Sequence, residues 1–332
     1  MIFHRGRYIV GGMLLLVVVR LSLEGPPLEA VRKAAPSSAV PFGSSDGIRQ
    51  RITNHTTQQQ SSSDKMENIS HLILQDDLVI VSGYWMIPKN VKHPVKAYSS
   101  WIGTTMRMCR EQNVSVVFYH NLDLGRNAAR RHSFASPLIS DKVELKYRPL
   151  SELDGSSDAL SLIDMCIEQP YDLPVAVPKK DKAITHKKHI NESSTEAWIS
   201  VVNVWISKLS LMEETIRNKP EVRFFMWLDA GIGRKWDGSF FPYMQQTPLD
   251  SRHVYFRSSP MFFNGSKIKF SAGLVLGARE PFLAFIERFK MELERVISSK
   301  VPLCHDEETI IDQMYREDEQ MQEIMASFVG KW

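Results

Sequence analysis

Apolar residues along the chain occur in two patterns, short continuous runs and longer stretches with helical spacing. A continuous apolar run indicates a strand that is covered on both faces, whereas apolar positions three and four residues apart indicate a helix packed on one side. Strands alternating with helices predict an α/β fold with a Rossmann-like, mostly parallel central sheet flanked by helices. The expected strands are 78–83, 114–119, 143–147, 223–228 and 270–277, and the expected helices are 98–108, 160–167, 198–216, 282–297 and a last one through 310–314.

The amino-terminal segment predicts a membrane anchor followed by a stem. Three basic residues, His4, Arg5 and Arg7, precede an apolar run over 8–19, which is the layout of a secretory signal or a signal anchor. Since no small-x-small cleavage site follows cleanly, we expect an uncleaved anchor within 1–23, with a cytosolic tail and a lumenal remainder. Cleavage of the segment would give a secreted protein.

Composition divides the rest of the chain into a stem and a folded region. Residues 24–75 are rich in Pro, Ser, Gln and Thr and predict a disordered stem, and 76–332 predicts one folded domain. The net charge of +3 on 332 residues, without a basic stripe interleaved with aromatic residues, does not indicate a nucleic-acid partner.

Glycosylation triplets and cysteines agree with a secretory route. Three cysteines allow at most one internal disulfide and leave one thiol, which we expect to be buried. The five Asn-x-Ser/Thr acceptor triplets begin at Asn54, Asn68, Asn113, Asn191 and Asn264.

The run from Arg223 to Gly231 is the most informative part of the sequence. Its apolar residues predict a central strand, and the strand ends on the carboxylate of Asp229, followed by a flexible turn. Ligands of such sheets bind at the carboxyl ends of the strands, so Asp229 is a candidate for a metal ion, a diphosphate or a sugar hydroxyl. Gly231 lets the backbone approach a ligand closely. The plain alternative is that Asp229 only begins a turn.

A lysine-rich stretch at 170–191 predicts a solvated loop, and the helix after it is expected to start with a capping box from Ser193 to Glu196. The charge of the loop could also attract a phosphate or an acidic glycan. Its lysines are Lys179, Lys180, Lys182, Lys187 and Lys188.

The pattern resembles the HtrL/YibB-like family, whose members are regarded as glycosyltransferases with a GT-A-type fold. The resemblance covers about 78–320 and rests on the order of several short elements. These are Val81–Pro88 with an aromatic pair, Tyr98 and Trp101 in the next helix, Trp205–Lys208, Trp227–Gly231 followed by Arg234, the small residues Ser271–Gly273, and a late acidic segment. The resemblance implies a GT-A-like catalytic domain over 76–332.

The resemblance also implies a divalent cation, Mn²⁺ or Mg²⁺, that bridges the diphosphate of a nucleotide sugar. GT-A enzymes usually hold it with an Asp-x-Asp pair, but the matching place in this chain reads Asp229-Ala230-Gly231 and offers one carboxylate. A second metal ligand could come from His305, Asp237 or Asp306. Alternatively, Arg234 could bind the phosphates directly.

Further candidates for the donor site and for catalysis follow from the same resemblance. Tyr84 and Trp85 could stack on a base, and the small side chain of Gly273 would leave room for the donor. In the segment Asp306-Glu307-Glu308, Asp306 or Glu307 could be the general base that takes a proton from the acceptor hydroxyl. The alternative is an N-cap with acidic residues in the first helical turn.

The sequence therefore predicts a single-pass type II glycosyltransferase of the Golgi or endoplasmic reticulum lumen. Its expected partners are a nucleotide-sugar donor, a glycan or glycoprotein acceptor, and the membrane through its anchor. A non-catalytic glycan-binding protein with the same fold is the first alternative, and the lone carboxylate at Asp229 supports it. A glycoside hydrolase that uses Asp229 and a late carboxylate is the second.

Overall fold

The computed structural model describes residues 70–71, 77–90, 92, 95–122, 138, 140–170, 177–234 and 249–328. The expected anchor, the cytosolic tail and most of the expected stem lie outside these residues. Two residues from the expected stem, Ser70–His71, form the short strand β1, which pairs with β6 (Leu249–Asp250). No helix in the described ranges combines the length and hydropathy that a membrane crossing requires.

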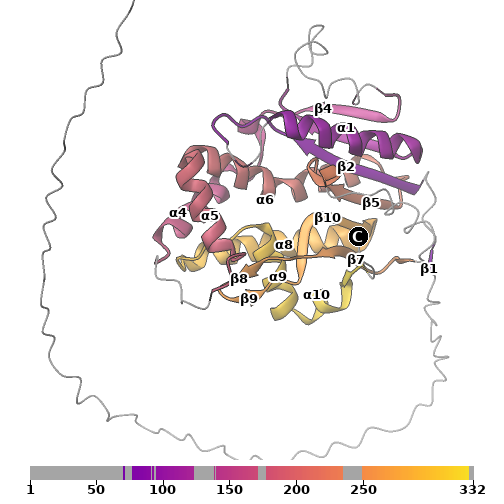
Figure 1. Ribbon diagram of the computed structural model, residues 1–332. Helices are drawn as coiled ribbons and strands as arrows, with labels where there is room; N and C mark the ends of the chain where they lie inside the picture. Colours follow the sequence, from indigo (N-terminus) through magenta and orange to yellow (C-terminus); the bar gives the residue numbers. More distant parts are fainter. Residues whose placement is uncertain are drawn as a thin grey trace, which may run out of the picture. The chain divides into compact units, whose positions relative to one another are not determined.

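A seven-stranded mixed sheet forms the centre of the domain (Figure 1). Four of its six strand pairs are parallel, and β10 runs antiparallel to both of its neighbours. The α/β fold with a mostly parallel sheet is therefore confirmed. The strand order is β11 (Met325–Ser327), β7 (Val254–Ser258), β10 (Phe270–Ala278), β5 (Phe224–Leu228), β2 (Leu78–Tyr84), β3 (Ser115–His120) and β4 (Val143–Tyr147).

Both faces of the sheet are covered, as the continuous apolar runs predict. Along β2, Val79 and Val81 belong to one core cluster, whereas Leu78 and Ile80 belong to the other. Side chains of α1 (Val95–Glu111) pack in the second cluster, while the helices α4 (Ser156–Glu168), α6 (Thr195–Asn218) and α8 (Arg279–Ser299) contribute to the first. The sheet is thus enclosed between two apolar layers.

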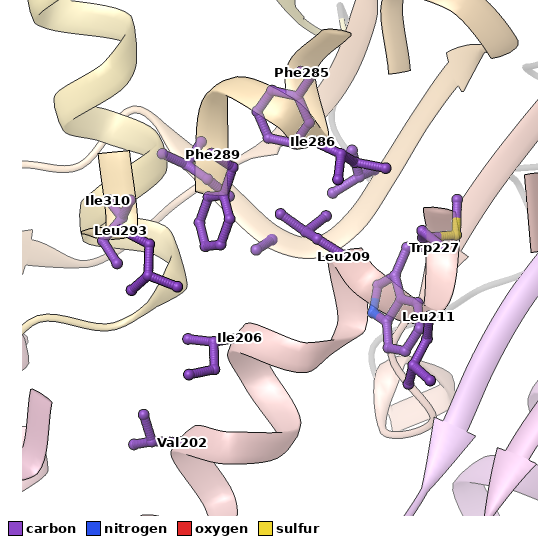
Figure 2. Packing of buried hydrophobic residues seen from close by; sticks show 14 of the residues in the cluster. Val202, Ile206, Leu209, Leu211, Trp227, Phe285, Ile286, Phe289, Leu293 and Ile310 are labelled. Atoms are coloured by element: carbon purple, nitrogen blue, oxygen red, sulfur yellow. The ribbon is translucent and has the colours of Figure 1, made fainter. Parts of the chain in front are cut away.

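The larger layer is built mainly from α6 and α8 (Figure 2). Both helices present the apolar stripes that the sequence predicts, and α9 (Glu307–Glu317) closes the layer. The labelled side chains are Val202, Ile206, Leu209 and Leu211 of α6, Trp227 of β5, Phe285, Ile286, Phe289 and Leu293 of α8, and Ile310 of α9. Short elements complete the domain: η2 (Leu150–Glu152), η3 (Ile232–Arg234), the hairpin β8 (Phe262–Phe263) with β9 (Ser266–Lys267), and α10 (Glu319–Ile324).

The prediction of a solvated lysine loop is wrong from residue 182 onward. Lys182–Ser193 forms the helix α5, because the side chain of Asp181 caps it by accepting a hydrogen bond from the backbone N–H of Ala183. Lys182 and Lys187 are buried rather than solvated. Figure 1 shows α5 beside α4 and α6, which it contacts. The next helix also begins one residue later than expected, since Ser194 and not Ser193 is its N-cap.

One disulfide joins Cys166 to Cys304, and Cys109 is a buried free thiol. The expectation of one disulfide and one buried leftover cysteine is confirmed. The bond ties the end of α4 to the segment that leads into α9. The backbone N–H of Cys304 also donates to the side chain of Gln169, so this segment is fixed at two points.

Candidate active site

Asp229 follows β5 at the carboxyl end of the strand, where the parallel part of the sheet places its ligand-binding edge. Its side chain is 42% exposed, so it is neither sealed in the core nor free of contacts. One oxygen, Oδ1, accepts a hydrogen bond from the indole Nε1–H of Trp227 at 2.7 Å and lies 3.6 Å from the ammonium of Lys208. This hydrogen bond and this ion pair orient the carboxylate.

Gly273 of β10 lies opposite Asp229 and leaves the second carboxylate oxygen open. The backbone N–H of Asp229 donates to the Gly273 carbonyl at 2.9 Å, which fixes the two residues side by side. A Cβ atom at position 273 would come within 3.1 Å of Oδ2 of Asp229. A side chain at position 273 would therefore crowd this oxygen, and the donor-binding role of Gly273 stays a prediction.

Lys208 of α6 is a buried cation, with a side chain that is 2% exposed. Its Nζ donates to the carbonyl oxygen of Ala272 at 3.1 Å and to Oε1 of Glu307 at 3.0 Å. Burial by itself would lower the pKa of Lys208, but the charges of Asp229 and Glu307 outweigh it and raise the pKa above its usual value. Lys208 is therefore a permanent positive charge between two carboxylates.

Asp306 is the N-cap of α9 and is fully buried. Its Oδ1 accepts from the backbone N–H of Thr309 at 3.0 Å, and its Oδ2 contacts Nζ of Lys182 at 2.6 Å and Nε2 of His186 at 3.1 Å. Burial would raise the pKa of Asp306, yet Lys182 and His186 outweigh it and hold the pKa far below its usual range. Both oxygens of this carboxylate are thus engaged in structural contacts, as the capping alternative expects.

Glu307 differs from Asp306 because it retains an oxygen without a partner. Its Oε1 binds Lys208, whereas Oε2 is buried and has no hydrogen-bond partner in the part of the chain that the structure describes. Burial raises the pKa of Glu307 to about 7, although Lys208 pulls it down. A carboxyl group with this pKa exchanges protons readily near neutral pH.

Glu308 fastens α9 to β10 and α5. Its Oε1 accepts from the Ser271 hydroxyl at 2.9 Å and from the backbone N–H of Ala272 at 3.3 Å, and its Oε2 lies 3.0 Å from Nζ of Lys182. These contacts are possible because the register of β10 against β7 shifts between Ser271 and Val275, which interrupts the pairing there. The N–H and carbonyl of Ala272 are then bound by Glu308 and Lys208, respectively.

The remaining residues of the predicted site lie in two environments. Tyr84 and Trp85 are buried, and the indole N–H of Trp85 donates to the carbonyl of Arg148 at 2.8 Å. Arg234 is exposed, and its guanidinium lies 5.4 Å from the ring centre of Trp101. The donor-binding roles of Tyr84, Trp85 and Arg234 stay predictions.

His305, which the sequence suggests as a second metal ligand beside Asp229, is buried. Its Nδ1 lies 3.3 Å from the Thr309 hydroxyl, its ring packs on Phe263, and burial lowers its pKa to about 4. None of the contacts found within the described ranges joins His305 to Asp229. Asp237 lies outside those ranges.

A divalent cation does not fit the described residues well. Within the described ranges, no group of three or more His, Cys, Asp or Glu side chains is arranged to hold a metal ion. The place of the second carboxylate in an Asp-x-Asp pair is Gly231, and a Cβ there would lie 3.3 Å from the ring of Tyr98. Oδ1 of Asp229 already accepts a hydrogen bond from Trp227 and forms an ion pair with Lys208.

Sequence reasoning assigned no role in the site to Lys182 and Lys208, which contact the acidic segment. Lys208 was noted only as the last residue of the Trp205–Lys208 element. One signal could have found it: Lys208 is seven residues after Val201 and three after Trp205, so it falls on the apolar stripe of a helix. A lysine on such a stripe needs a buried anionic partner.

Comparisons with known proteins give a structural similarity at low sequence identity. No protein-family model matches the chain, and no curated protein sequence matches it. The chain is similar to the crystal structure of mouse xyloside xylosyltransferase 1 in its apo form, with a TM-score of 0.38 and 10% sequence identity over 76% of this chain and 85% of that chain.

Proposed function

We propose that this chain is a glycosyltransferase that moves a sugar from a nucleotide donor to a glycan or protein acceptor. The observation that carries the proposal is the carboxylate of Asp229 at the ligand-binding edge of the sheet. One of its oxygens is fixed by Trp227 and Lys208, while the other faces the space left by Gly273. The resemblance of the sequence to the HtrL/YibB-like glycosyltransferases supports the same reading.

Asp229 binds a hydroxyl group of the donor sugar in this proposal. An ionised carboxylate accepts hydrogen bonds only, and a sugar hydroxyl is a suitable donor. Because Oδ1 is held by the Trp227 indole, Oδ2 has a fixed direction and needs little reorganisation when the sugar arrives. A carboxylate that only began a turn would not need an indole and a buried ammonium behind it.

Glu307 is the general base in this proposal. The acceptor hydroxyl must lose its proton as its oxygen attacks the sugar carbon, and a carboxylate with a pKa of about 7 is suited to take it. Asp306, the other candidate, has both oxygens bound by Thr309, Lys182 and His186. We therefore assign the base to Glu307 alone.

Two cations are candidates for the diphosphate of the donor. Lys92 lies 4.2 Å from the ring centre of Trp205, and burial lowers its pKa to about 8, so it is largely charged at neutral pH. The charges of Glu307 and Asp229 partly offset the effect of burial on the pKa of Lys92. Arg234 follows Asp229 by five residues and supplies a fork of donors that suits phosphate oxygens.

We propose a lumenal location for this enzyme, and two features of the chain support it. The disulfide between Cys166 and Cys304 is the kind that persists in oxidising compartments. Three of the expected glycosylation asparagines, Asn113, Asn191 and Asn264, are exposed. A signal anchor in the Golgi or endoplasmic reticulum membrane, as the amino-terminal sequence predicts, would place the domain there.

Release of nucleoside diphosphate from a panel of nucleotide sugars tests the proposal. We expect turnover of at least one donor by the full chain and a loss of at least a hundredfold in Asp229→Asn, which removes the charge but keeps the shape. Glu323→Gln, an exposed change remote from β5, serves as the control. A folded sample that binds glycans but releases no diphosphate would instead establish the glycan-binding alternative. Hydrolysis of a glycoside without a nucleotide would establish the hydrolase alternative.

A further inference from the structure

Lys208 combines two properties that a divalent cation would bring to the site: a positive charge and a fixed place between oxygen atoms. Its side chain is 2% exposed, and a lysine is rarely buried this far unless its ammonium is paired. Three oxygen atoms surround Nζ: the Ala272 carbonyl at 3.1 Å, Oε1 of Glu307 at 3.0 Å and Oδ1 of Asp229 at 3.6 Å. The ammonium donates hydrogen bonds to the first two of these oxygens and forms an ion pair with the third.

The backbone of β10 also supplies an acceptor for Lys208. The Ala272 carbonyl points to Nζ rather than into a regular ladder, because the register of β10 shifts against β7 between Ser271 and Val275. A Cβ atom at Gly231 would lie 3.3 Å from the Tyr98 ring, so a side chain there would require the ring to shift. The position that would supply a second carboxylate is therefore crowded by an aromatic ring, while an ammonium pairs with the first carboxylate.

We infer that the ammonium of Lys208 takes the place of a divalent cation in this site, so that Asp229 works without a metal ion. The inference rests on the proposed function for the role of Asp229. Lys208 is a positioning residue: it touches Asp229 and Glu307, and it holds both carboxylates close together by cancelling their repulsion. A dication on Oδ1 of Asp229 would lie close to this ammonium, and like charges at such a distance repel each other.

Direct measurement of Mn²⁺ binding tests the inference without any donor sugar. The signal of free aqueous Mn²⁺ in electron paramagnetic resonance falls when the ion binds, so a titration counts bound ions. We expect the wild-type chain and Asp229→Asn to give the same titration, because Asp229 binds no Mn²⁺. A site in the wild-type chain that disappears in Asp229→Asn would overturn the inference.

The matched variant Lys208→Met removes the charge and keeps the length of the side chain. We expect it to gain a Mn²⁺ site at least tenfold tighter than any Asp229-dependent binding in the wild type, since Asp229 and Glu307 are left without a cation. The double variant Lys208→Met/Asp229→Asn should lose that site. A folded Lys208→Met chain, checked by circular dichroism, that gains no site would count against the inference.

If Lys208→Met does not fold, the comparison of the wild type with Asp229→Asn still decides, because Asp229 is at the surface. The inference and the proposed function fail separately. Absence of turnover with every donor refutes the proposed function, whereas the Mn²⁺ count remains valid. Where turnover is found, we expect a chelator to leave its rate within twofold of the untreated value, and a rate restored only by Mn²⁺ would refute the inference.

Discussion

At the scale of single residues, the site depends on which oxygen atoms are bound and which are left open. Asp229 and Glu307 each give one oxygen to Lys208, and each has a second oxygen without a hydrogen bond among the described residues. Both oxygens of Asp306 are bound. Two predictions concern the second oxygens of Asp229 and Glu307.

Gly273→Ala should reduce turnover at least tenfold while costing little stability. The nearest atoms to the added methyl group belong to the Asp229 carboxylate, with Oδ2 at 3.1 Å, so the methyl group enters the space assigned to the sugar. Gly277→Ala is the control on the same strand, because its methyl group meets Val254 and not the site. The rates and urea unfolding of both variants check this. Equal turnover in Gly273→Ala and the wild type would contradict the assigned sugar position.

Glu307→Gln should lower the turnover rate by about a hundredfold to ten thousandfold, the usual contribution of a general base. In the wild type, the rate should fall as the pH drops through about 7, because Glu307 becomes protonated and can no longer accept a proton. This inflection should be absent from the variant. Glu317→Gln, an exposed change on the same helix, should keep it. An unchanged pH profile in Glu307→Gln would assign the base elsewhere.

At the scale of elements, the first turn of α9 is held to α5 through Lys182. This ammonium contacts Asp306 at 2.6 Å and Glu308 at 3.0 Å, and its side chain is 10% exposed. Glu307 thus lies between two residues that Lys182 holds in place. The ion pairs of Lys182 with Asp306 and Glu308 therefore help to position the candidate base.

Lys182→Met should lower the free energy of unfolding by about 3–5 kcal/mol, the usual cost of leaving one partner of a buried ion pair alone. The carboxylate of Asp306 stays fully buried and retains only His186 and the helix cap. Lys179→Met, at an exposed position of the same segment, should change it by less than about 0.5 kcal/mol. Urea unfolding at neutral pH measures both. A loss below about 1 kcal/mol in Lys182→Met would mean that the ion pairs of Lys182 contribute little to stability.

The elements themselves were largely predictable from the sequence, whereas their charged contacts were not. Strands such as β3 and β5 were found because apolar runs encode burial locally. The burial of Lys182 depends on Asp306 and Glu308, far along the chain, so a lysine-rich segment looks like a solvated loop until its partners are known. The helix α5 was missed for this reason. Asp229 was found because a carboxylate directly after a buried strand is a local signal.

At the scale of the whole molecule, the disulfide between Cys166 and Cys304 joins segments 138 residues apart. Closing a loop of this length reduces the entropy of the unfolded chain, and the simple chain-entropy estimate gives about 5 kcal/mol. The bond also fixes the backbone two residues before Asp306. Stability and the geometry of the acidic segment are therefore linked.

The double variant Cys166→Ala/Cys304→Ala should lower the free energy of unfolding by about 2–5 kcal/mol, the usual cost of losing a native disulfide. The wild type unfolded in the presence of a thiol reductant should show a similar loss, and the reductant should not affect the double variant. Urea unfolding with and without reductant tests both expectations. A wild type that is indifferent to the reductant would show that the bond carries no stability.

The central place of β10 has a consequence for synthesis at the ribosome. This strand lies between β5 and β7, yet its residues are translated long after those of β5. Until residues 270–278 emerge, β5 presents an open strand edge, and Lys208 lacks both Ala272 and Glu307. The nascent chain therefore exposes an unpaired strand edge while the residues between β5 and β10 are translated, and we expect it to depend on chaperones until β10 pairs with β5.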